Sequence, residues 1–325
     1  MKHGSINTNG IDIHYVEAGS GPLVIFCHGF PESWYSWRHQ LLAISQAGYH
    51  AVAMDMRGYG RTSRPQAVDA YVISELVADV SGLVTELGYR SAVVVGHDWG
   101  GPVAWYAALM RPDLFSAVAV LSVPYVAPMR LPRGVTLNDI MMANAGDREY
   151  YRLYFQAPGV AEKELEADVR RSLLAFFYTV SGDIVKDGTR QVGWNGYFPK
   201  GETLISQLVE PDSLPGWLTE QDLDFYVDEF RSSGFRGGIN WYRNIVRLPE
   251  LLAPFLGDRV TQPALYMYGE YDQICGNSPA VIEEMRTNLD NLQAAIRLPG
   301  AGHWLQQERP DEVNEALLTF LARSG

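Results

Sequence analysis

The chain has 325 residues, of which 47% are hydrophobic, 20% are charged and 12% are aromatic, and this composition is typical of a soluble globular protein. Its length suits a large α/β core with an inserted subdomain. The formal net charge of −12 argues against nucleic acid or an anionic membrane as a partner, because both require clustered lysine and arginine.

The cysteines and the N-terminal segment limit which classes of protein remain possible. Cys27 and Cys275 are the only cysteines, and two cysteines do not form a metal-ligand pattern. Cys27 ends an apolar run that begins at Leu23, so we expect a buried free thiol there. The N-terminal segment lacks the apolar centre of a signal peptide, and no run of about 18 apolar residues occurs elsewhere. We therefore expect no membrane span and a cytoplasmic protein, while the oligomeric state stays open between monomer and homodimer.

The first third of the chain alternates short apolar runs with segments of helical spacing. The apolar runs are rich in Val, Ile or Ala and predict buried strands at Leu23–Phe26, Ala51–Met54, Ala92–Val95 and Ser116–Val123. Helical spacing predicts helices over Trp34–Ala47 and Val72–Leu87, each followed by a glycine where a helix stop is expected. This order predicts a parallel, doubly wound sheet with right-handed crossovers.

The alternation stops between Pro124 and about Pro263. Helical patterns in this segment cover Glu162–Phe177, Thr219–Arg231 and Ile239–Val246. Strand patterns return at Ala264–Tyr268 and Ala294–Leu298, with helices expected over Pro279–Leu289 and Asp311–Ala322. We therefore predict a helical cap, residues 126–259, inserted between strands 6 and 7 of a core made of residues 1–125 and 260–325.

The sharpest motif is Gly96-His97-Asp98-Trp99-Gly100-Gly101, directly after a predicted strand. Small residues on both sides of a central side chain are the pattern of the nucleophile elbow, a tight turn from strand to helix. The alternative, an aspartate that only caps a helix, does not explain glycines at both 96 and 100. We therefore interpret Asp98 as a nucleophile.

An aspartate at this position points to a particular chemistry. A carboxylate is ionised at neutral pH and can displace a leaving group at a saturated carbon without a base. The product is an ester of the enzyme, whose carbonyl carbon water can then attack. Asp98 therefore indicates epoxides or alkyl halides as substrates rather than ordinary esters.

The expected partners follow in the chain order that this fold requires, nucleophile, acid and histidine. His303 and Asp272 each follow one of the last two predicted strands, at the carboxyl ends where doubly wound sheets place their sites. Glu270 is a rival carboxylate, and a turn aspartate or a structural histidine is the alternative for each residue. The shared order and context favour a catalytic triad.

With these motifs the sequence resembles the epoxide hydrolases of the α/β-hydrolase fold, over nearly the whole chain. His28-Gly29-Phe30-Pro31 is similar to the family's H-G-x-P segment. The resemblance implies an eight-stranded, mostly parallel sheet, a cis Phe30–Pro31 bond and an oxyanion hole formed by the N–H groups of Phe30 and Trp99. Glu32 resembles a carboxylate near the hydrolytic water; a charge at a helix N-terminus is the alternative.

Two cap tyrosines complete the resemblance. Tyr154 and Tyr242 are similar to the lid tyrosines that would bind the ring oxygen and donate a proton to it, although Tyr150, Tyr151 and Tyr178 are rivals and core packing is the alternative for any of them. The implied activity is hydrolysis of a small apolar epoxide to a vicinal diol, with no cofactor and no metal.

Two other functions stay open at this point. A haloalkane or haloacid dehalogenase shares the aspartate elbow, and Trp99 is compatible with it, but Phe30 replaces the asparagine that many haloalkane dehalogenases use for halide. Some relatives of this fold are ligand-binding proteins with weakened catalysis, and these are expected to have a damaged triad, which this sequence does not have.

Overall fold

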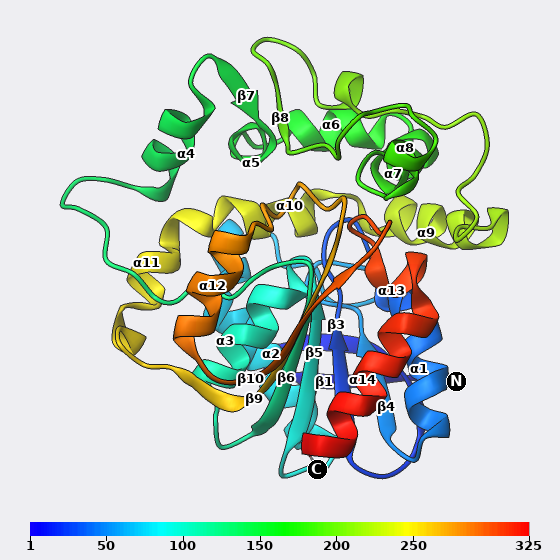
Figure 1. The fold of residues 1–325 in the computed structure, drawn as a ribbon, viewed down its shortest axis with the longest axis vertical. Helices are drawn as coiled ribbons and strands as arrows, with labels where there is room; N and C mark the ends of the chain where they lie inside the picture. The colour runs from blue at the N-terminus through cyan, green and yellow to red at the C-terminus, as the bar shows by residue number, and fades with distance from the viewer. Residues whose placement is uncertain (325) are drawn as a thin grey trace.

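The computed structural model describes residues 1–324 and contains one eight-stranded sheet beneath a cap (Figure 1). The sheet order is β1-β2-β4-β3-β5-β6-β9-β10, in which β2 pairs antiparallel with β1 and β4 and the remaining pairs are parallel. The strands are β1 (Lys2–Thr8), β2 (Ile11–Gly19), β3 (Leu23–Cys27), β4 (His50–Met54), β5 (Ala92–His97), β6 (Phe115–Leu121), β9 (Val260–Gly269) and β10 (Leu289–Leu298).

Helices cover both faces of the sheet because its central strands are apolar on both sides. One buried cluster joins the sheet to α1 and α14, and the other joins its opposite face to α2, α3 and α12. The core helices are α1 (Arg38–Gln46), α2 (Ile73–Glu86), α3 (Gly100–Met110), α12 (Pro279–Asn288), α13 (Leu305–Glu308) and α14 (Pro310–Ser324), with 3-10 helices at Trp34–Trp37 and Val68–Tyr71.

Between β6 and β9, the sixth and seventh strands of the main sheet, the chain forms a set of mostly helical elements that we call the cap. Its helices are α4 (Leu137–Ala145), α5 (Tyr151–Tyr154), α6 (Val160–Glu166), α7 (Val169–Thr179), α8 (Asp183–Lys186), α9 (Glu220–Ser233), α10 (Arg236–Arg243) and α11 (Leu248–Leu251), with 3-10 helices at Ile205–Gln207, Ile245–Arg247 and Ala253–Phe255. A small sheet pairs β7 (Arg148–Tyr150) with β8 (Tyr197–Pro199). The boundaries at 126 and 259 stay our proposal.

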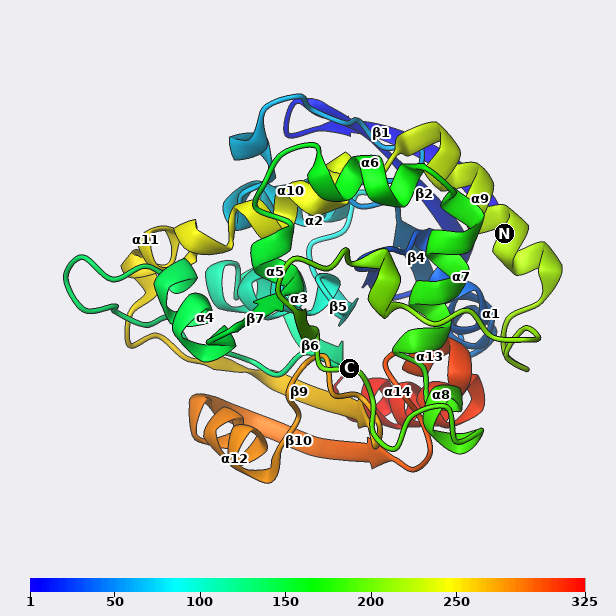
Figure 2. The same ribbon diagram turned by 90° about the horizontal axis from the view of Figure 1, so that it is seen from above.

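The cap covers the end of the sheet at which the parallel strands terminate. Figure 2, seen from above, shows α5, α6, α7 and α10 arranged around the carboxyl ends of β5 and β6. Residues at these strand ends therefore face the cap and not bulk water, which is where open α/β sheets form their ligand sites. Within residues 1–324, no helix combines the length and the apolar character that crossing a membrane requires.

The prediction of a single helix over Glu162–Phe177 was wrong. The structure divides it into α6 and α7, because Asp168 takes an extended conformation with φ −146°. Its carboxylate accepts a hydrogen bond from the backbone N–H of Arg171 at 3.0 Å, so it caps the start of α7. The cap is therefore built from shorter helices than the spacing of apolar residues indicated.

Candidate active site

Asp98 lies in the turn between β5 and α3 and has φ +49°, in the left-handed region that side chains other than glycine seldom adopt. The flanking glycines make this turn possible. A Cβ atom at Gly100 would lie 2.0 Å from the carbonyl oxygen of Cys27, and one at Gly96 would lie 2.0 Å from that of Gly100. The sequence motif therefore corresponds to a turn that holds Asp98 above the sheet, where it is 8% exposed.

The loop after β3 supplies a backbone donor to this carboxylate. The N–H of Phe30 donates to Asp98 Oδ1 at 2.7 Å, and the Phe30–Pro31 bond is cis, as expected. Within residues 1–324, the N–H of Trp99 makes no hydrogen bond to Asp98. Burial alone would raise the pKa of Asp98, but hydrogen bonding to His303 and the Phe30 N–H outweighs burial and lowers it. Asp98 is therefore ionised at neutral pH.

His303 lies between two carboxylates. Its Nδ1 is 3.1 Å from Asp272 Oδ2 and its Nε2 is 3.4 Å from Asp98 Oδ2. Burial alone would lower the pKa of His303, but Asp272, Cys275 and Asp98 raise it well above its ordinary value. The three residues of the predicted triad are therefore in contact, in the order Asp272, His303, Asp98.

The rival carboxylate Glu270 has a different role. Its Oε1 pairs with Arg297 at 2.8 Å, and its Oε2 accepts from the backbone N–H of Gly300 at 2.8 Å. Both oxygens therefore hold the loop that leads to His303. Asp272, whose side chain is fully buried, is the carboxylate that contacts the imidazole.

Glu32 is fully buried and connects two loops of the site. Its Oε2 accepts from the Gly29 N–H at 3.0 Å and contacts His97 Nδ1 at 2.7 Å, while its Oε1 accepts from Gln306 at 2.8 Å. His97 in turn contacts the carbonyl oxygen of His303 at 2.8 Å. Since both oxygens have protein partners, the geometry favours a role for Glu32 in holding the loop that contains Gly29 and Phe30 over a role in positioning water.

Two buried cap tyrosines line the cavities that contain Asp98. Tyr242, on α10, is 3% exposed, and its ring lies edge-on to Trp99 and Phe30, with centroids 5.2 and 5.6 Å away. Tyr151, the first residue of α5, is 5% exposed and lies 5.7 Å from Tyr242 by ring centroids. Burial raises the pKa of both phenols, so both hold their protons at neutral pH.

The structure corrects the prediction for Tyr154. Its hydroxyl donates to Glu164 at 2.6 Å, its ring packs on Phe198 and it does not line the cavities that contain Asp98. Burial and the bond to Glu164 raise its pKa to about 12. Tyr151 and Tyr154 are three residues apart in one helical turn, and the sequence pattern did not separate them.

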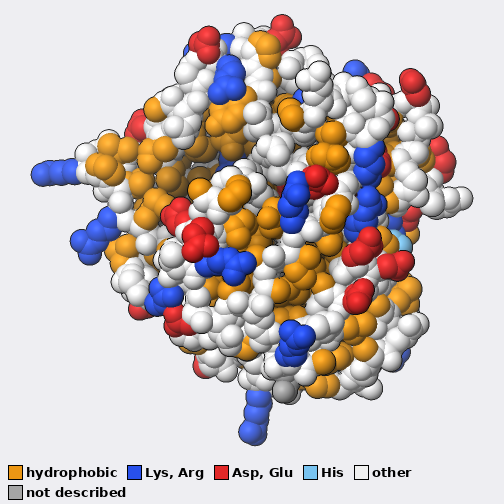
Figure 3. Space-filling model, viewed as in Figure 1, with side chains coloured by type: hydrophobic (Ala, Val, Ile, Leu, Met, Phe, Trp, Pro, Cys, Tyr) orange, Lys and Arg blue, Asp and Glu red, His pale blue; other side chains and the backbone are white. Residues whose placement is uncertain are grey.

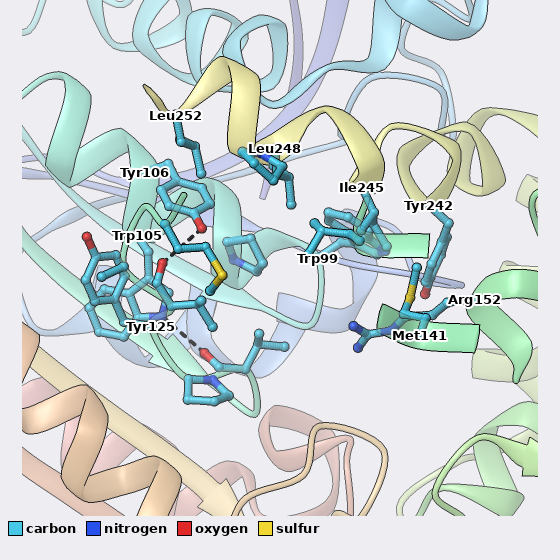
Figure 4. A pocket seen from close by; sticks show the side chains of 18 of the residues that line it. Trp99, Trp105, Tyr106, Tyr125, Met141, Arg152, Tyr242, Ile245, Leu248 and Leu252 are labelled. Carbon is cyan, nitrogen blue, oxygen red and sulfur yellow. Dashed lines mark hydrogen bonds between the residues drawn. The ribbon is translucent and has the colours of Figure 1, made fainter. Parts of the chain in front are cut away.

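Asp98, Tyr151 and Tyr242 line two cavities that meet at Asp98. We call the larger one, of about 270 Å³, the large arm, and the smaller one, of about 20 Å³, the small arm. The walls of the large arm are mainly apolar and aromatic, and Figure 4 shows a set of them: Trp99, Trp105, Tyr106, Tyr125, Met141, Ile245, Leu248 and Leu252. The remaining walls of the small arm are Phe30, Phe176, Val180, Trp194, Ile274, His303 and Trp304.

The large arm is bounded by α4 and α11 on its outer side, through Ile140, Met141 and Leu248. Figure 3 shows a hollow with hydrophobic walls on this side of the molecule, at the upper left, where Figure 1 places α4 and α11. An apolar substituent can therefore extend from Asp98 along this arm.

The sequence analysis named one of the following two residues only as a rival to Tyr154 and did not consider the other. Tyr151 and its neighbour Arg152 line the large arm, and Arg152 Nε donates to the Tyr151 hydroxyl oxygen at 3.0 Å. The available signal was an arginine within the aromatic run from Tyr150 to Phe155, an unusual place for a cation.

Among the described residues, Asp272, Cys275 and His303 place potential metal-ligand atoms within 4.8 Å of one another. Asp272 and His303 are already paired with each other, and Cys275 Sγ lies 3.9 Å from His303 Nδ1. Cys275 is therefore best described as a neighbour of the triad. Cys27 is a buried free thiol, as predicted, and burial raises its pKa.

Known proteins resemble this chain over nearly its full length. The family model described as alpha/beta hydrolase fold matches residues 22–310. Epoxide hydrolase A of Mycobacterium tuberculosis is 41% identical, covering 97% of this chain and 96% of the relative, and epoxide hydrolase 2 of Siraitia grosvenorii is 36% identical, covering 99% of both. A solved epoxide hydrolase from an endophytic Streptomyces, 45% identical, superposes with a TM-score of 0.92 and covers 99% of this chain and 95% of that one. The chain therefore belongs to the epoxide hydrolases of the α/β-hydrolase fold.

Proposed function

We propose that the protein hydrolyses epoxides to vicinal diols and that Asp98 forms a covalent ester in the first of two steps. The ring oxygen accepts hydrogen bonds from Tyr151 and Tyr242 while an Asp98 oxygen attacks a ring carbon. The ring C–O bond breaks, and a phenol proton passes to the oxygen that leaves the carbon. Each well-placed proton donor of this kind contributes about 100-fold or more to the rate.

In the second step His303, oriented by Asp272, takes a proton from water, and the resulting hydroxide attacks the carbonyl carbon of the ester. The developing oxyanion accepts from the N–H groups of Phe30 and Trp99. The ester C–O bond then breaks, and the departing diol oxygen takes the proton of the new Asp98 carboxylic acid, which restores the carboxylate. The proton held by His303 returns to the phenolate left by the first step, and the diol leaves. The residues need no cofactor or metal for these steps.

One observation carries the proposal: an ionised carboxylate and two protonated phenols line the same cavity. A carboxylate supplies the nucleophile, and the phenols supply protons to an oxygen leaving group. The names of the relatives in Mycobacterium tuberculosis and Siraitia grosvenorii support the same reaction.

Single-turnover hydrolysis in water enriched in oxygen-18 tests the ester. We expect the label to enter the Asp98 carboxylate in the first turnover, because the hydroxide attacks the ester carbonyl and the diol takes its oxygen from the enzyme. Label that enters the diol directly from unlabelled enzyme would exclude the ester, as would diol formation by Asp98→Ala.

The two alternatives make different predictions. A dehalogenase releases chloride or bromide from haloalkanes and forms no diol from styrene oxide. A ligand-binding relative binds without turnover and is unaffected by Asp98→Asn. Assays of halide release, diol formation and ligand binding on the same preparation decide between the three functions.

We also propose a cytoplasmic location. Two free cysteines, of which Cys27 is fully buried, are compatible with a reducing compartment. Recovery of the protein in a membrane or secreted fraction of its own cells would contradict this.

A further inference from the structure

Arg152 introduces a positive charge into an otherwise apolar cavity. It follows Tyr151 on α5, and among the described residues that line the large arm it is the one cationic side chain. Figure 4 shows its guanidinium extending from α5 toward the interior of the cavity. The charged side chains of the arm are therefore Asp98 at the reaction centre and Arg152 beside it.

Arg152 is partly exposed, and it lacks the carboxylate partner that the buried arginines Arg57 and Arg243 have. Arg57 pairs with Asp79 at 2.6 Å, and Arg243 pairs with Glu162 at 2.7 Å. Within residues 1–324, no carboxylate lies within ion-pair distance of Arg152. Because Arg152 is only partly exposed, its charge is less screened by water and favours an anionic partner. The folded chain does not supply that partner, but a ligand in the cavity can.

The contacts of Arg152 fix one edge of its guanidinium and leave the other edge free. Nε donates to the Tyr151 oxygen at 3.0 Å, and the carbon at the centre of the guanidinium lies 5.8 and 5.6 Å from the ring centroids of Tyr150 and Tyr151. The two terminal amino groups make no hydrogen bond to the described residues. Two parallel N–H donors at the end of a guanidinium match the two oxygens of a carboxylate.

We propose that the substrate is an epoxide whose longer substituent carries a carboxylate, bound by Arg152 in the large arm near the ring. This inference rests on the proposed epoxide hydrolysis and specifies its substrate class. Because Arg152 contacts Tyr151, which holds the ring oxygen, the acid group lies only a short chain away from the oxirane. The walls of the small arm carry no Lys or Arg among the described residues, so the carboxylate also fixes which substituent enters which arm.

A second role for Arg152 is already visible: its donation to the Tyr151 oxygen leaves the phenol proton free for the substrate. This supporting role does not depend on the charge of the substrate. Carboxylate binding does depend on it, so a pair of substrates that differ only in that charge separates the two roles.

The test compares kcat/KM for ω-epoxyheptanoate and its methyl ester. We expect the enzyme to prefer the acid by about 10- to 100-fold, the range for a charge-assisted hydrogen-bonded pair. Arg152→Met should reduce this ratio to about 1 or below, and Arg152→Lys should keep part of it. Arg148→Met is the control, because it removes a cation from the same cap segment outside the cavity and should leave the ratio unchanged.

A wild-type enzyme without a preference for the acid would overturn the proposal, as would an Arg152→Met variant that slows acid and ester by the same factor. Competitive inhibition of wild-type enzyme by hexanoate and methyl hexanoate gives a second measurement that needs no variant, and equal inhibition by the two would also overturn it. Absence of diol from both epoxides would instead contradict the proposed hydrolysis.

Discussion

Removal of single hydroxyl groups distinguishes the tyrosines that line the cavity from Tyr154, which lies elsewhere in the cap. Tyr151→Phe and Tyr242→Phe each remove one proton donor from the cavity, and we expect each to slow ester formation by about 100-fold. Tyr154→Phe loses only the bond to Glu164 and should react at close to the wild-type rate. Rapid-quench measurement of the ester in a single turnover checks all three, and a large loss in Tyr154→Phe with a normal Tyr151→Phe would reverse the assignment.

We expect different pH profiles for the two half-reactions, ester formation and ester hydrolysis, because His303 acts as a base only in the second. His303 must be neutral to accept a proton from water, so ester hydrolysis falls as the pH drops below its pKa in the ester. Esterification removes the negative charge of Asp98, one of the groups that raise this pKa, so the value in the ester lies below that in the free enzyme. Asp98 itself has a lowered pKa, so ester formation persists to lower pH.

The ester should therefore accumulate in acid, and mass spectrometry of acid-quenched enzyme measures it. Asp272→Asn removes a carboxylate that raises the pKa of His303, so the acid limb of hydrolysis should move to lower pH. If both half-reactions decline over the same pH range, His303 is not the base of the second step.

At the level of residues, the sequence identified the core of the site better than its cap. Asp98, Asp272 and His303 follow strands, and a parallel sheet brings its strand ends together, so their contact was predictable. Tyr151 and Tyr154 occupy one helical turn in an aromatic segment, and only the path of the cap backbone decides which one reaches Asp98. The role of Arg152 was not predictable either, because its lack of a carboxylate partner is a property of the fold.

At the level of elements, the elbow depends on the close approach of β5, α3 and the loop after β3. A methyl group at Gly100 would overlap the carbonyl oxygen of Cys27, so Gly100→Ala should lower the free energy of unfolding by about 1–3 kcal/mol or more. Gly216 is the control, since a Cβ atom there meets no atom within 4 Å. Urea unfolding measures both variants, and equal stability would show that the elbow accommodates a side chain.

Elements with a strong apolar pattern were predicted to within a few residues. The predicted strand Ala92–Val95 corresponds to β5, and the predicted helix Val72–Leu87 corresponds to α2. The bounds of β1 were not predictable, because it is an edge strand of largely exposed residues with no buried run. In the cap, Asp168 takes an extended conformation and its capping bond begins a second helix, where the hydrophobic spacing alone predicted one continuous helix.

At the level of the whole molecule, the different volumes of the large and small arms predict which epoxides react. About 20 Å³ accommodates one or two water-sized groups, so the small arm suits hydrogen or a methyl group on the second ring carbon. We expect styrene oxide to react with a higher kcat/KM than trans-stilbene oxide, which carries a phenyl ring on each carbon. Ile274→Ala should enlarge the small arm and raise the relative rate for stilbene oxide; no change in the ratio would show that this wall does not limit the substrate.

The pairing of β6 with β9 closes the sheet across the entire inserted cap. Asp98, the proposed nucleophile, precedes this insertion in the chain, and Asp272 and His303 follow it. During synthesis the ribosome therefore releases Asp98 long before His303. An incomplete polypeptide has the proposed nucleophile but lacks the base proposed to hydrolyse an ester formed on it. Docking of the late strands turns this incomplete site into one that can complete a catalytic cycle.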